Sequence, residues 1–264
     1  MQDAELSHYI EKALPLIEQT LRELRSELMT HYGVIEHEKK QDNTSVTALD
    51  MRAEEILKTA ITSLGYDVGF YGEEFGITGN TDTFWTIDPI DGTEAFLRGM
   101  PFCTNMLCLI HDGQLEASII YSFPLDEMYR AVKGHGATCN GEPITVSDRY
   151  IQHASIEFEI QPTSQENRDM FFSLPRYSTV KFAAAGFGFC LVARGAIEAR
   201  VQVNGYGKLW DYAPGALLVQ EAGGSVANIG TDTFDYHDLN FVASNREVHA
   251  ELQKFFAGNL PTQN

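Results

Sequence analysis

The sequence predicts a mixed α/β or α+β domain built of packed layers. Segments with the β-branched and aromatic pattern of strands are interleaved with segments whose apolar residues recur every three or four positions, as in amphipathic helices. Gly, Pro and Asn separate many of these segments. With 264 residues, 44% of them hydrophobic, the chain is long enough to bury a sizeable core.

Helices are predicted at both ends of the chain and between the strands. The first presents an apolar stripe that ordinary core packing explains, made of Ile10, Ala13, Leu14, Ile17, Leu21, Leu24 and Leu28. Thr47-Ala-Leu-Asp50 has the form of a capping box ahead of a second helix over 50–64. Further helices are predicted at 93–97, near 165–172, at 186–194, from about 211 to 223 with Pro214 in the first turn, and after 243.

Strands are predicted where short apolar runs end in turn residues. They lie near 68–71, 84–88, 106–111, 115–122, 128–132, 155–160, 178–182, 196–203, 225–229 and 240–243. Asn140-Gly141 is typical of a two-residue hairpin turn. No repeat or low-complexity linker divides the chain, so we expect one domain over 1–264.

Charge and composition narrow the possible partners. Acidic residues number 37 against 19 basic ones, and the net charge of -18 disfavours nucleic acid polymers and anionic membranes. The four cysteines stand in or beside apolar segments without a CxxC pair, which favours buried reduced thiols. We see neither a secretory leader nor an apolar run of membrane-spanning length, and therefore expect a cytoplasmic protein.

The most informative stretch is Trp-Thr-Ile-Asp-Pro-Ile-Asp-Gly-Thr at 85–93. It places Asp88 and Asp91 where an apolar strand stops, with Pro89 and Gly92 breaking regular structure. Two acids crowded on a turn repel one another and lose hydration unless a hard cation such as Mg2+ accepts their oxygens. The alternative is a pair of turn residues that bond to nearby backbone N–H groups.

Two other acidic sites favour the metal interpretation. Glu73 and Glu74 lie in Tyr-Gly-Glu-Glu-Phe-Gly, and Asp211 lies in Leu-Trp-Asp-Tyr-Ala-Pro-Gly. Each places a carboxylate at the edge of an apolar segment. Asp211 could also cap the helix that follows it. Glu74 supports its neighbour, which we take as the ligand.

Taken in order and spacing, three motifs resemble the inositol monophosphatase family. They are Gly72-Glu73-Glu74, Asp88-Pro-Ile-Asp91-Gly-Thr93 and Trp210-Asp211, and weaker likenesses extend from about 39 to 245. The resemblance implies a five-layer α-β-α-β-α sandwich of the inositol monophosphatase or sugar phosphatase type. It also implies an N-terminal metal-ligand half at about 1–145, a C-terminal half at about 146–264, and a homodimer.

By the same resemblance the chain binds two or three Mg2+ ions and a small phosphate ester. The metal ligands would be Glu73, Asp88, Asp91, Asp211 and the backbone carbonyl of Ile90. These are oxygen donors, as Mg2+ prefers. A phosphate monoester brings about two negative charges, so an acidic pocket could hold it only after cations invert the local field.

The resemblance also implies roles for other site residues. Thr93 and Glu73 would orient the attacking water, and Asp50 would be an acid near the metals unless capping is its whole role. Thr93 alternatively serves as a plain helix N-cap. The substrate-binding set would be Asp91, Gly92, Thr93, Ala184, Ala185 and Asp211, with N–H groups at 92 and 93 facing the phosphate. Lys39 would belong to a loop that closes over the site.

The sequence departs from the family where substrates are chosen. Ala183-Ala184-Ala185 replaces a segment that often carries a hydroxyl, and Gln202 lies in the region where animal members have a substrate-binding glutamate. Inositol monophosphate is the predicted substrate. Alternatives are histidinol phosphate, 3'-phosphoadenosine 5'-phosphate or a sugar bisphosphate, and surplus acids such as Glu94 or Glu157 would suit the cationic histidinol ester.

Two other classes of protein fit the sequence less well. A non-catalytic, metal-binding regulatory homologue is the main alternative, motivated by the altered segment at 183–185. An aspartyl phosphatase of the haloacid dehalogenase type needs Asp-x-Asp spacing, which Asp88-Pro-Ile-Asp91 lacks.

Overall fold

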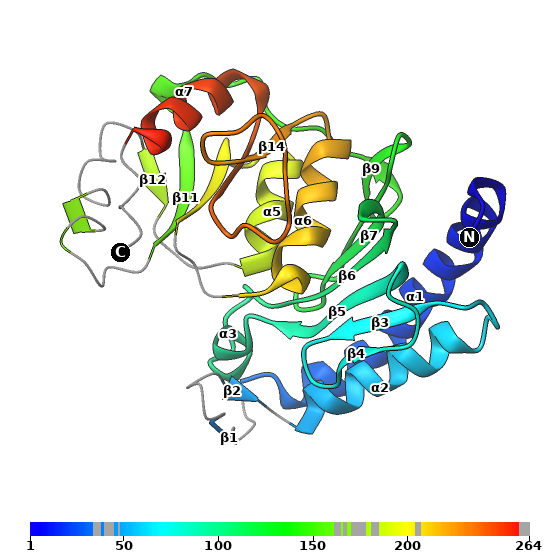
Figure 1. The fold of residues 1–264 in the computed structure, drawn as a ribbon. Coiled ribbons are helices and arrows are strands. Elements are labelled where there is room, and N and C mark those ends of the chain that lie inside the picture. The colour runs from blue at the N-terminus through cyan, green and yellow to red at the C-terminus, as the bar shows by residue number, and fades with distance from the viewer. Residues whose placement is uncertain are drawn as a thin grey trace.

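In the computed structural model, the chain folds into five layers of secondary structure in the order α-β-α-β-α (Figure 1). The structure describes residues 1–33, 38–39, 45–46, 48–160, 165, 168–169, 178–180, 185–203 and 207–258, with backbone only at 38–39, 45–46, 160, 178–180 and 185. A small antiparallel pair, β1 (Glu38–Lys39) and β2 (Ser45–Val46), lies outside the main layers.

The larger sheet has eight strands within the described residues, in the order β10-β9-β8-β7-β6-β5-β3-β4. Neighbouring strands are antiparallel except β3 and β5, which are parallel. The strands are β3 (Gly69–Gly72), β4 (Gly76–Thr78), β5 (Thr83–Asp91), β6 (Thr104–His111), β7 (Gln114–Ser122), β8 (Glu127–Val132), β9 (Gly136–Cys139) and β10 (Glu142–Pro143). Every residue of β6 is buried, because helices cover both faces of the sheet.

Helices α1 (Asp3–His31) and α2 (Ala48–Thr62) form the outer layer on one face of this sheet. The apolar stripe of α1 packs against strand residues such as Trp85 and Ile87. The buried indole of Trp85 donates a hydrogen bond to the hydroxyl of Tyr9 at 2.6 Å. Burial raises the pKa of Tyr9 to about 12, which keeps the phenol neutral in the core.

The middle layer consists of α5 (Ala185–Ala193) and α6 (Leu209–Glu221), which lie between the two sheets (Figure 1). Their apolar side chains form one core with residues of both sheets. The two helices approach closely, since a Cβ on Gly215 would lie 2.1 Å from Cγ of Phe189. Helix α5 is apolar all round and α6 is apolar along its middle, from Ala213 to Val219, as expected for elements covered on two faces.

The smaller sheet and one helix complete the sandwich. In the described residues its strand order is β12-β11-β13-β15-β14, with bounds Ser178–Val180, Ser155–Ile160, Ala199–Val203, Phe241–Ser244 and Ser225–Asn228. Helix α7 (Arg246–Ala257) covers its outer face near the short helix η1 (Ile151–His153). None of the described helices is long and apolar enough to cross a membrane.

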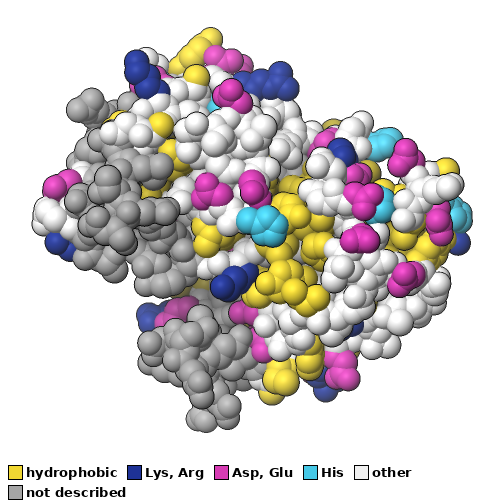
Figure 2. Space-filling view, in the orientation of Figure 1, with side chains coloured by type: hydrophobic (Ala, Val, Ile, Leu, Met, Phe, Trp, Pro, Cys, Tyr) yellow, Lys and Arg dark blue, Asp and Glu magenta, His cyan; other side chains and the backbone are white. Residues whose placement is uncertain are grey.

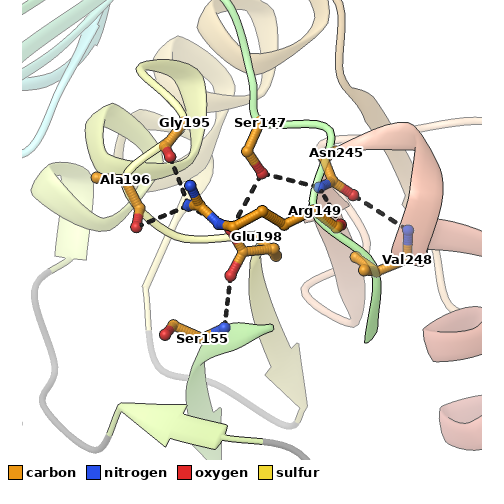
Figure 3. A network of polar contacts seen from close by, with 8 residues as sticks. All are labelled: Ser147, Arg149, Ser155, Gly195, Ala196, Glu198, Asn245 and Val248. Carbon is orange, nitrogen blue, oxygen red and sulfur yellow. Dashed lines mark hydrogen bonds and ion pairs between the residues drawn. The ribbon is translucent and has the colours of Figure 1, made fainter. Parts of the chain in front are cut away.

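A polar network anchors the segment that connects the two sheets (Figure 3). The buried carboxylate of Glu198 accepts hydrogen bonds from Ser147 Oγ, Arg149 Nε and the N–H of Ser155. Asn245 donates to Ser147 Oγ and to the carbonyl of Arg149, and its side-chain oxygen caps α7. The connection is therefore tied to β11, β13 and α7 at once.

The predicted layered fold is confirmed, with differences at some boundaries. Asn140 and Gly141 form the hairpin turn between β9 and β10, both with positive φ, of 50° and 84°. Helix α6 begins at Leu209, so Pro214 falls in its second turn and not in the first. Strand β13 begins at Ala199, three residues late, because the N–H groups of Ala196 and Ile197 still bond to the carbonyl of Leu191.

Two of the predicted segments lie partly outside the described residues, and a third has different bounds in the structure. The helix near 165–172 lies almost wholly outside the described residues, and β12 is described only to Val180. Helix α2 spans Ala48–Thr62 instead of 50–64. Thr47, the expected capping residue, lies outside the described residues, while Asp50 is in the first helical turn.

Replacing Tyr9 with Phe should lower the free energy of unfolding by about 1–3 kcal/mol. The change removes the acceptor of the Trp85 indole N–H, and Trp85 is fully buried. Urea unfolding followed by fluorescence measures the loss. Tyr150→Phe is the control, since Tyr150 is 62% exposed and its change should stay within about 0.5 kcal/mol. Equal stability of the two variants would show that the indole bond contributes nothing.

Candidate metal centre

Asp88 and Asp91 point to the same side of the larger sheet because β5 contains a bulge. Residues three apart on a regular strand face opposite sides. Here the pairing with β6 shifts by one residue between Asp88, opposite Met106, and Asp91, opposite Thr104. The extra residue turns the second carboxylate toward the first. The Asn105 side chain bonds to the carbonyl of Pro89 inside the bulge and holds it in place.

Asp211 reaches the same place from the first turn of α6. Its carboxylate accepts a hydrogen bond from the backbone N–H of Lys208, so it does help to cap the helix. A Cβ on Gly207 would lie 2.6 Å from Asp211 Oδ2, which favours glycine there. One oxygen each of Asp88, Asp91 and Asp211 lies within 4.8 Å of the other two. The capping and cluster roles of Asp211 are therefore compatible.

Glu73 stands next to this cluster on the turn that follows β3. Its N–H donates to the carbonyl of Ile87 at 3.0 Å, one residue before Asp88. Its negative charge raises the pKa of both Asp88 and Asp211. The cluster of mutually close oxygens consists of the three aspartates, and Glu73 is an electrostatic neighbour of it.

The cluster concentrates negative charge away from water. Burial raises the pKa of Asp88 well above its ordinary value, and the charges of Glu73, Asp91 and Asp211 raise it further. Burial and the charge of Asp211 likewise raise the pKa of Asp91. For Asp211, burial is again the main cause and brings its pKa to about 6. These carboxylates need either protons or cations for compensation.

Protein donors hold the carboxylates without neutralising them. Asp91 Oδ2 accepts hydrogen bonds from Thr104 Oγ1 at 3.0 Å and from the N–H of Gly186 at 2.7 Å. Asp88 Oδ1 is buried and has no hydrogen-bond partner among the described residues. An all-oxygen set with an unused buried carboxylate oxygen fits a hard divalent cation such as Mg2+.

Gly92 and Thr93 lie where β5 ends and α3 (Thr93–Leu97) begins. Gly92 has φ of 77°, and a Cβ there would lie 2.6 Å from the carbonyl oxygen of Phe102. Gly92 is itself the N-cap, and the Thr93 hydroxyl bonds back to the carbonyl of Ile90 at 3.0 Å. The simple N-cap interpretation of Thr93 is therefore wrong.

Of the remaining predicted site residues, the structure describes two in full, two by their backbone alone and one not at all. Asp50 is buried in the first turn of α2, and Ile90 is buried within the bulge. Lys39 lies in β1 and Ala185 opens α5, with side chains that are not described, and Ala184 lies outside the described residues.

Sequence reasoning missed the two donors to Asp91. Thr104 opens the strand opposite the bulge, and Gly186 contributes its backbone N–H. A Cβ on Gly186 would lie 2.2 Å from Met106 Sδ, so glycine allows α5 to approach the large sheet. The Gly-Phe-Gly sequence inside an apolar helix was the available signal, since glycine there implies close packing.

Comparisons with known proteins agree with this architecture. A sequence profile of the inositol monophosphatase family matches residues 5–259. Inositol monophosphatase 1 of Bos taurus is 31% identical over 220 residues, covering 78% of this chain and 79% of that protein. A SuhB protein of Neisseria meningitidis, named as a candidate Nus factor, is 30% identical over 235 residues, covering 86% and 89%.

Solved structures show the same likeness. An IMPase of Thermotoga maritima has a TM-score of 0.83 at 27% identity, covering 92% of this chain and 95% of that one. The SuhB protein of Bartonella henselae has a TM-score of 0.84 at 26% identity, covering 92% and 97%. The fold is thus an α-β-α-β-α sandwich with an acidic cluster between its sheets. The chain belongs to the inositol monophosphatase family.

Magnesium ions are expected to stabilise the folded chain more strongly as pH rises. The raised pKa values of the aspartates mean that, above about pH 4, the metal-free folded state keeps protons that the unfolded chain has released. Metal-free stability therefore falls as pH rises through the folded pKa values, including that of Asp211 at about 6. Cation binding requires the deprotonated carboxylates, so it strengthens over the same range.

The measurement is the rise in Tm on adding Mg2+, recorded by scanning fluorimetry with Na+ at equal ionic strength as the control. The rise should be larger at about pH 7 than at about pH 5, since more of the cluster is deprotonated. A rise of the same size at both pH values would contradict this assignment of the cluster.

Proposed function

We propose that this protein is a Mg2+-dependent phosphomonoesterase that hydrolyses a small phosphorylated metabolite, with inositol monophosphate as the first candidate. The observation that carries the proposal is the convergence of Asp88, Asp91 and Asp211 in a chain of the inositol monophosphatase family. The carboxylates fit divalent cations and could not hold a phosphate without them, because their charges repel it.

The metal ligands in this proposal are Glu73, Asp88, Asp91, Asp211 and the carbonyl of Ile90. When bound, the cations would activate a water molecule and neutralise the charge on the leaving oxygen. The protein's part is to place the ligands. The bulge in β5 sets Asp88 against Asp91, and the first turn of α6 brings Asp211 from the other side.

Thr93 and Glu73 are proposed to orient the attacking water. The Thr93 hydroxyl donates its proton to the carbonyl of Ile90, so its oxygen remains available as an acceptor for a water proton. The N–H groups of Gly92 and Thr93 are proposed to hold phosphate oxygens. Asp91, Ala184, Ala185 and Asp211 are proposed as the other substrate-binding residues. Asp50, buried at the start of α2, is proposed as an acid near the metals, and Lys39 as part of a closing loop.

The structure bears on two residues considered for substrate choice. Gln202 is buried and donates its amide hydrogen to the hydroxyl of Tyr212, so this amide hydrogen is used inside the protein. Glu157 is also buried and forms an ion pair with Arg200 at 2.6 Å. Its charge is already compensated, which weakens the argument that it serves a cationic ester such as histidinol phosphate.

The surface favours a small ligand over a polyanion. On the face shown in Figure 2, acidic side chains are widely distributed, while Lys and Arg occur singly or in small groups among the described residues. With a net charge of -18, attraction for a phosphate ester has to come from the metal-loaded centre. A homodimer and a cytoplasmic location are part of the proposal.

A second candidate function is that of a metal-binding regulatory protein. The similarity to SuhB of Neisseria meningitidis, named as a candidate Nus factor, favours it. In that case the acidic cluster would bind cations without useful turnover. Failure to release phosphate from any ester tested with Mg2+, by a protein that does bind Mg2+, would favour this candidate.

Replacing Asp91 with Asn should reduce phosphate release at least about 10²-fold. The variant loses a charge that Thr104 and Gly186 hold toward the other aspartates. Its fold should persist, since Asn has nearly the same shape and relieves repulsion. Asp112→Asn is the control, because Asp112 is 74% exposed on the turn between β6 and β7 and its φ of 46° suits Asn. Near-normal turnover by the Asp91 variant would refute the proposal.

Among phosphate esters, inositol monophosphate should have the highest kcat/KM. The panel includes histidinol phosphate, 3'-phosphoadenosine 5'-phosphate and a sugar bisphosphate, each assayed with Mg2+ by phosphate release. Discrimination arises from contacts outside the phosphate, so preferences appear in kcat/KM. Preference for another ester would keep the reaction class and replace the substrate.

A further inference from the structure

Glu54 of α2 places a fully buried carboxylate beneath the turn that follows β3. Glu54 is 0% exposed, and its Oε2 accepts a hydrogen bond from the N–H of Glu74 at 2.8 Å. Its other oxygen occupies the space next to Gly72, where a Cβ would lie only 1.9 Å from Oε1. The absence of a side chain at Gly72 therefore allows the carboxylate of Glu54 to sit against the backbone.

The same turn carries Glu73 to the acidic cluster. On one side its N–H bonds to the carbonyl of Ile87 at the end of β5. On the other side the next N–H, that of Glu74, bonds to Glu54. The backbone of Glu73 is thus fixed by β5 and α2 together. Its carboxylate is close enough to Asp88 and Asp211 to act on both electrostatically.

Core packing alone does not explain a carboxylate in this position. A buried acid is strongly destabilising unless groups around it favour its charge, and an apolar side chain would avoid that cost. The N–H groups of Glu74 and Phe75 and the charge of Lys58 partly oppose the desolvation of Glu54. Glu74 and Phe75 belong to the turn itself, and Lys58 lies one helical turn further along α2.

We propose that Glu54 is a positioning residue that holds the turn of Glu73 and thereby sets how Glu73 meets the metals. The inference rests on the proposed function only in taking Glu73 as a metal ligand. It assigns to α2 a second task besides supplying Asp50, which lies one turn earlier on the same helix face. Glu54 acts as an outer partner of the site and does not touch the substrate.

Glu54→Ala tests the inference through Mg2+ binding measured by calorimetry on the metal-free protein. Loss of an outer partner should weaken Mg2+ affinity about 10-fold to 100-fold, with a lower kcat and a smaller change in KM. Glu54→Gln keeps an oxygen that can accept from Glu74, and should restore affinity to within about threefold of wild type. If Glu54→Ala does not fold, Glu54→Gln and Glu54→Asp still test the link, and the shorter Asp should weaken binding more.

Two controls separate positioning from general destabilisation. Glu55→Ala changes the neighbouring exposed acid on the same helix and should leave Mg2+ affinity unchanged. Leu14→Ala opens a cavity in the core of α1 and should lower Tm by an amount similar to or larger than Glu54→Ala does, without weakening Mg2+ binding at a temperature where it is folded. If Glu54→Ala bound Mg2+ as tightly as Leu14→Ala, the inference would be overturned.

A double-mutant cycle shows whether Glu54 acts through Glu73. In a Glu73→Gln background, Glu54→Ala should have little further effect on Mg2+ affinity, because the group it positions is already altered. Equal weakening in both backgrounds would overturn the inference. Because the measured quantity is Mg2+ affinity, this test does not require the protein to release phosphate. A wild-type protein that binds Mg2+ but releases no phosphate would sink the phosphatase proposal and leave the cycle interpretable.

Discussion

Three buried carboxylates repel one another at the centre of this protein, and the surrounding elements have to hold them together. Asp88, Asp91 and Asp211 lie within a few ångströms of one another and are largely removed from water. Burial raises the pKa of each acid, and the charge of Asp211 raises the pKa of Asp88 and Asp91 further. Such an arrangement is costly for a metal-free protein. The surrounding backbone nevertheless holds the acids in place. The bulge in β5 positions Asp88 and Asp91, the N–H of Gly186 at the start of α5 bonds to Asp91, and the first turn of α6 carries Asp211.

The acids come from different layers of the sandwich, so their geometry depends on how the layers pack. Asp88 and Asp91 belong to the larger sheet, and Asp211 belongs to the middle helix layer. Helix α6 is joined to the larger sheet at its end, where the Glu221 carboxylate accepts from the N–H groups of Gly134 and Gly136 at 2.8 Å each. Movement of α6 against the sheet would therefore break these hydrogen bonds.

Two other buried charges among the described residues, those of Arg200 and Glu198, have ion-pair partners within the protein, which distinguishes them from the cluster. Arg200 lies in the smaller sheet, is 1% exposed, and pairs with Glu157 and Glu159. Glu198 has Arg149 as its partner. Among the described residues, the donors to Asp91 and Asp211 are neutral, and Arg200 adds a weak charge effect on Asp91. Where the fold gathers several buried acids at one place without a pairing cation, an external cation is the natural complement.

Local sequence patterns predicted much of this structure, and long-range contacts decided the rest. The strand at Ser155–Ile160 and the Asn140-Gly141 turn follow from periodicity and backbone preference, which neighbouring residues determine. The placement of Asp88 and Asp91 at a strand end is visible in the same way, and the family resemblance supplied the order of layers. None of these local patterns reveals the bulge that turns both acids to one face.

The kind of site is readable from the residues alone: carboxylates at the ends of apolar segments, in a chain too acidic to attract phosphate without cations. The partners of the residues around that site follow from how the layers pack. Gly186 offers its N–H to Asp91, Glu54 supports the turn of Glu73, and Gln202 is bonded to Tyr212. These pairs are separated by 95, 20 and 10 residues, and only packing of the folded layers brings them within hydrogen-bond distance.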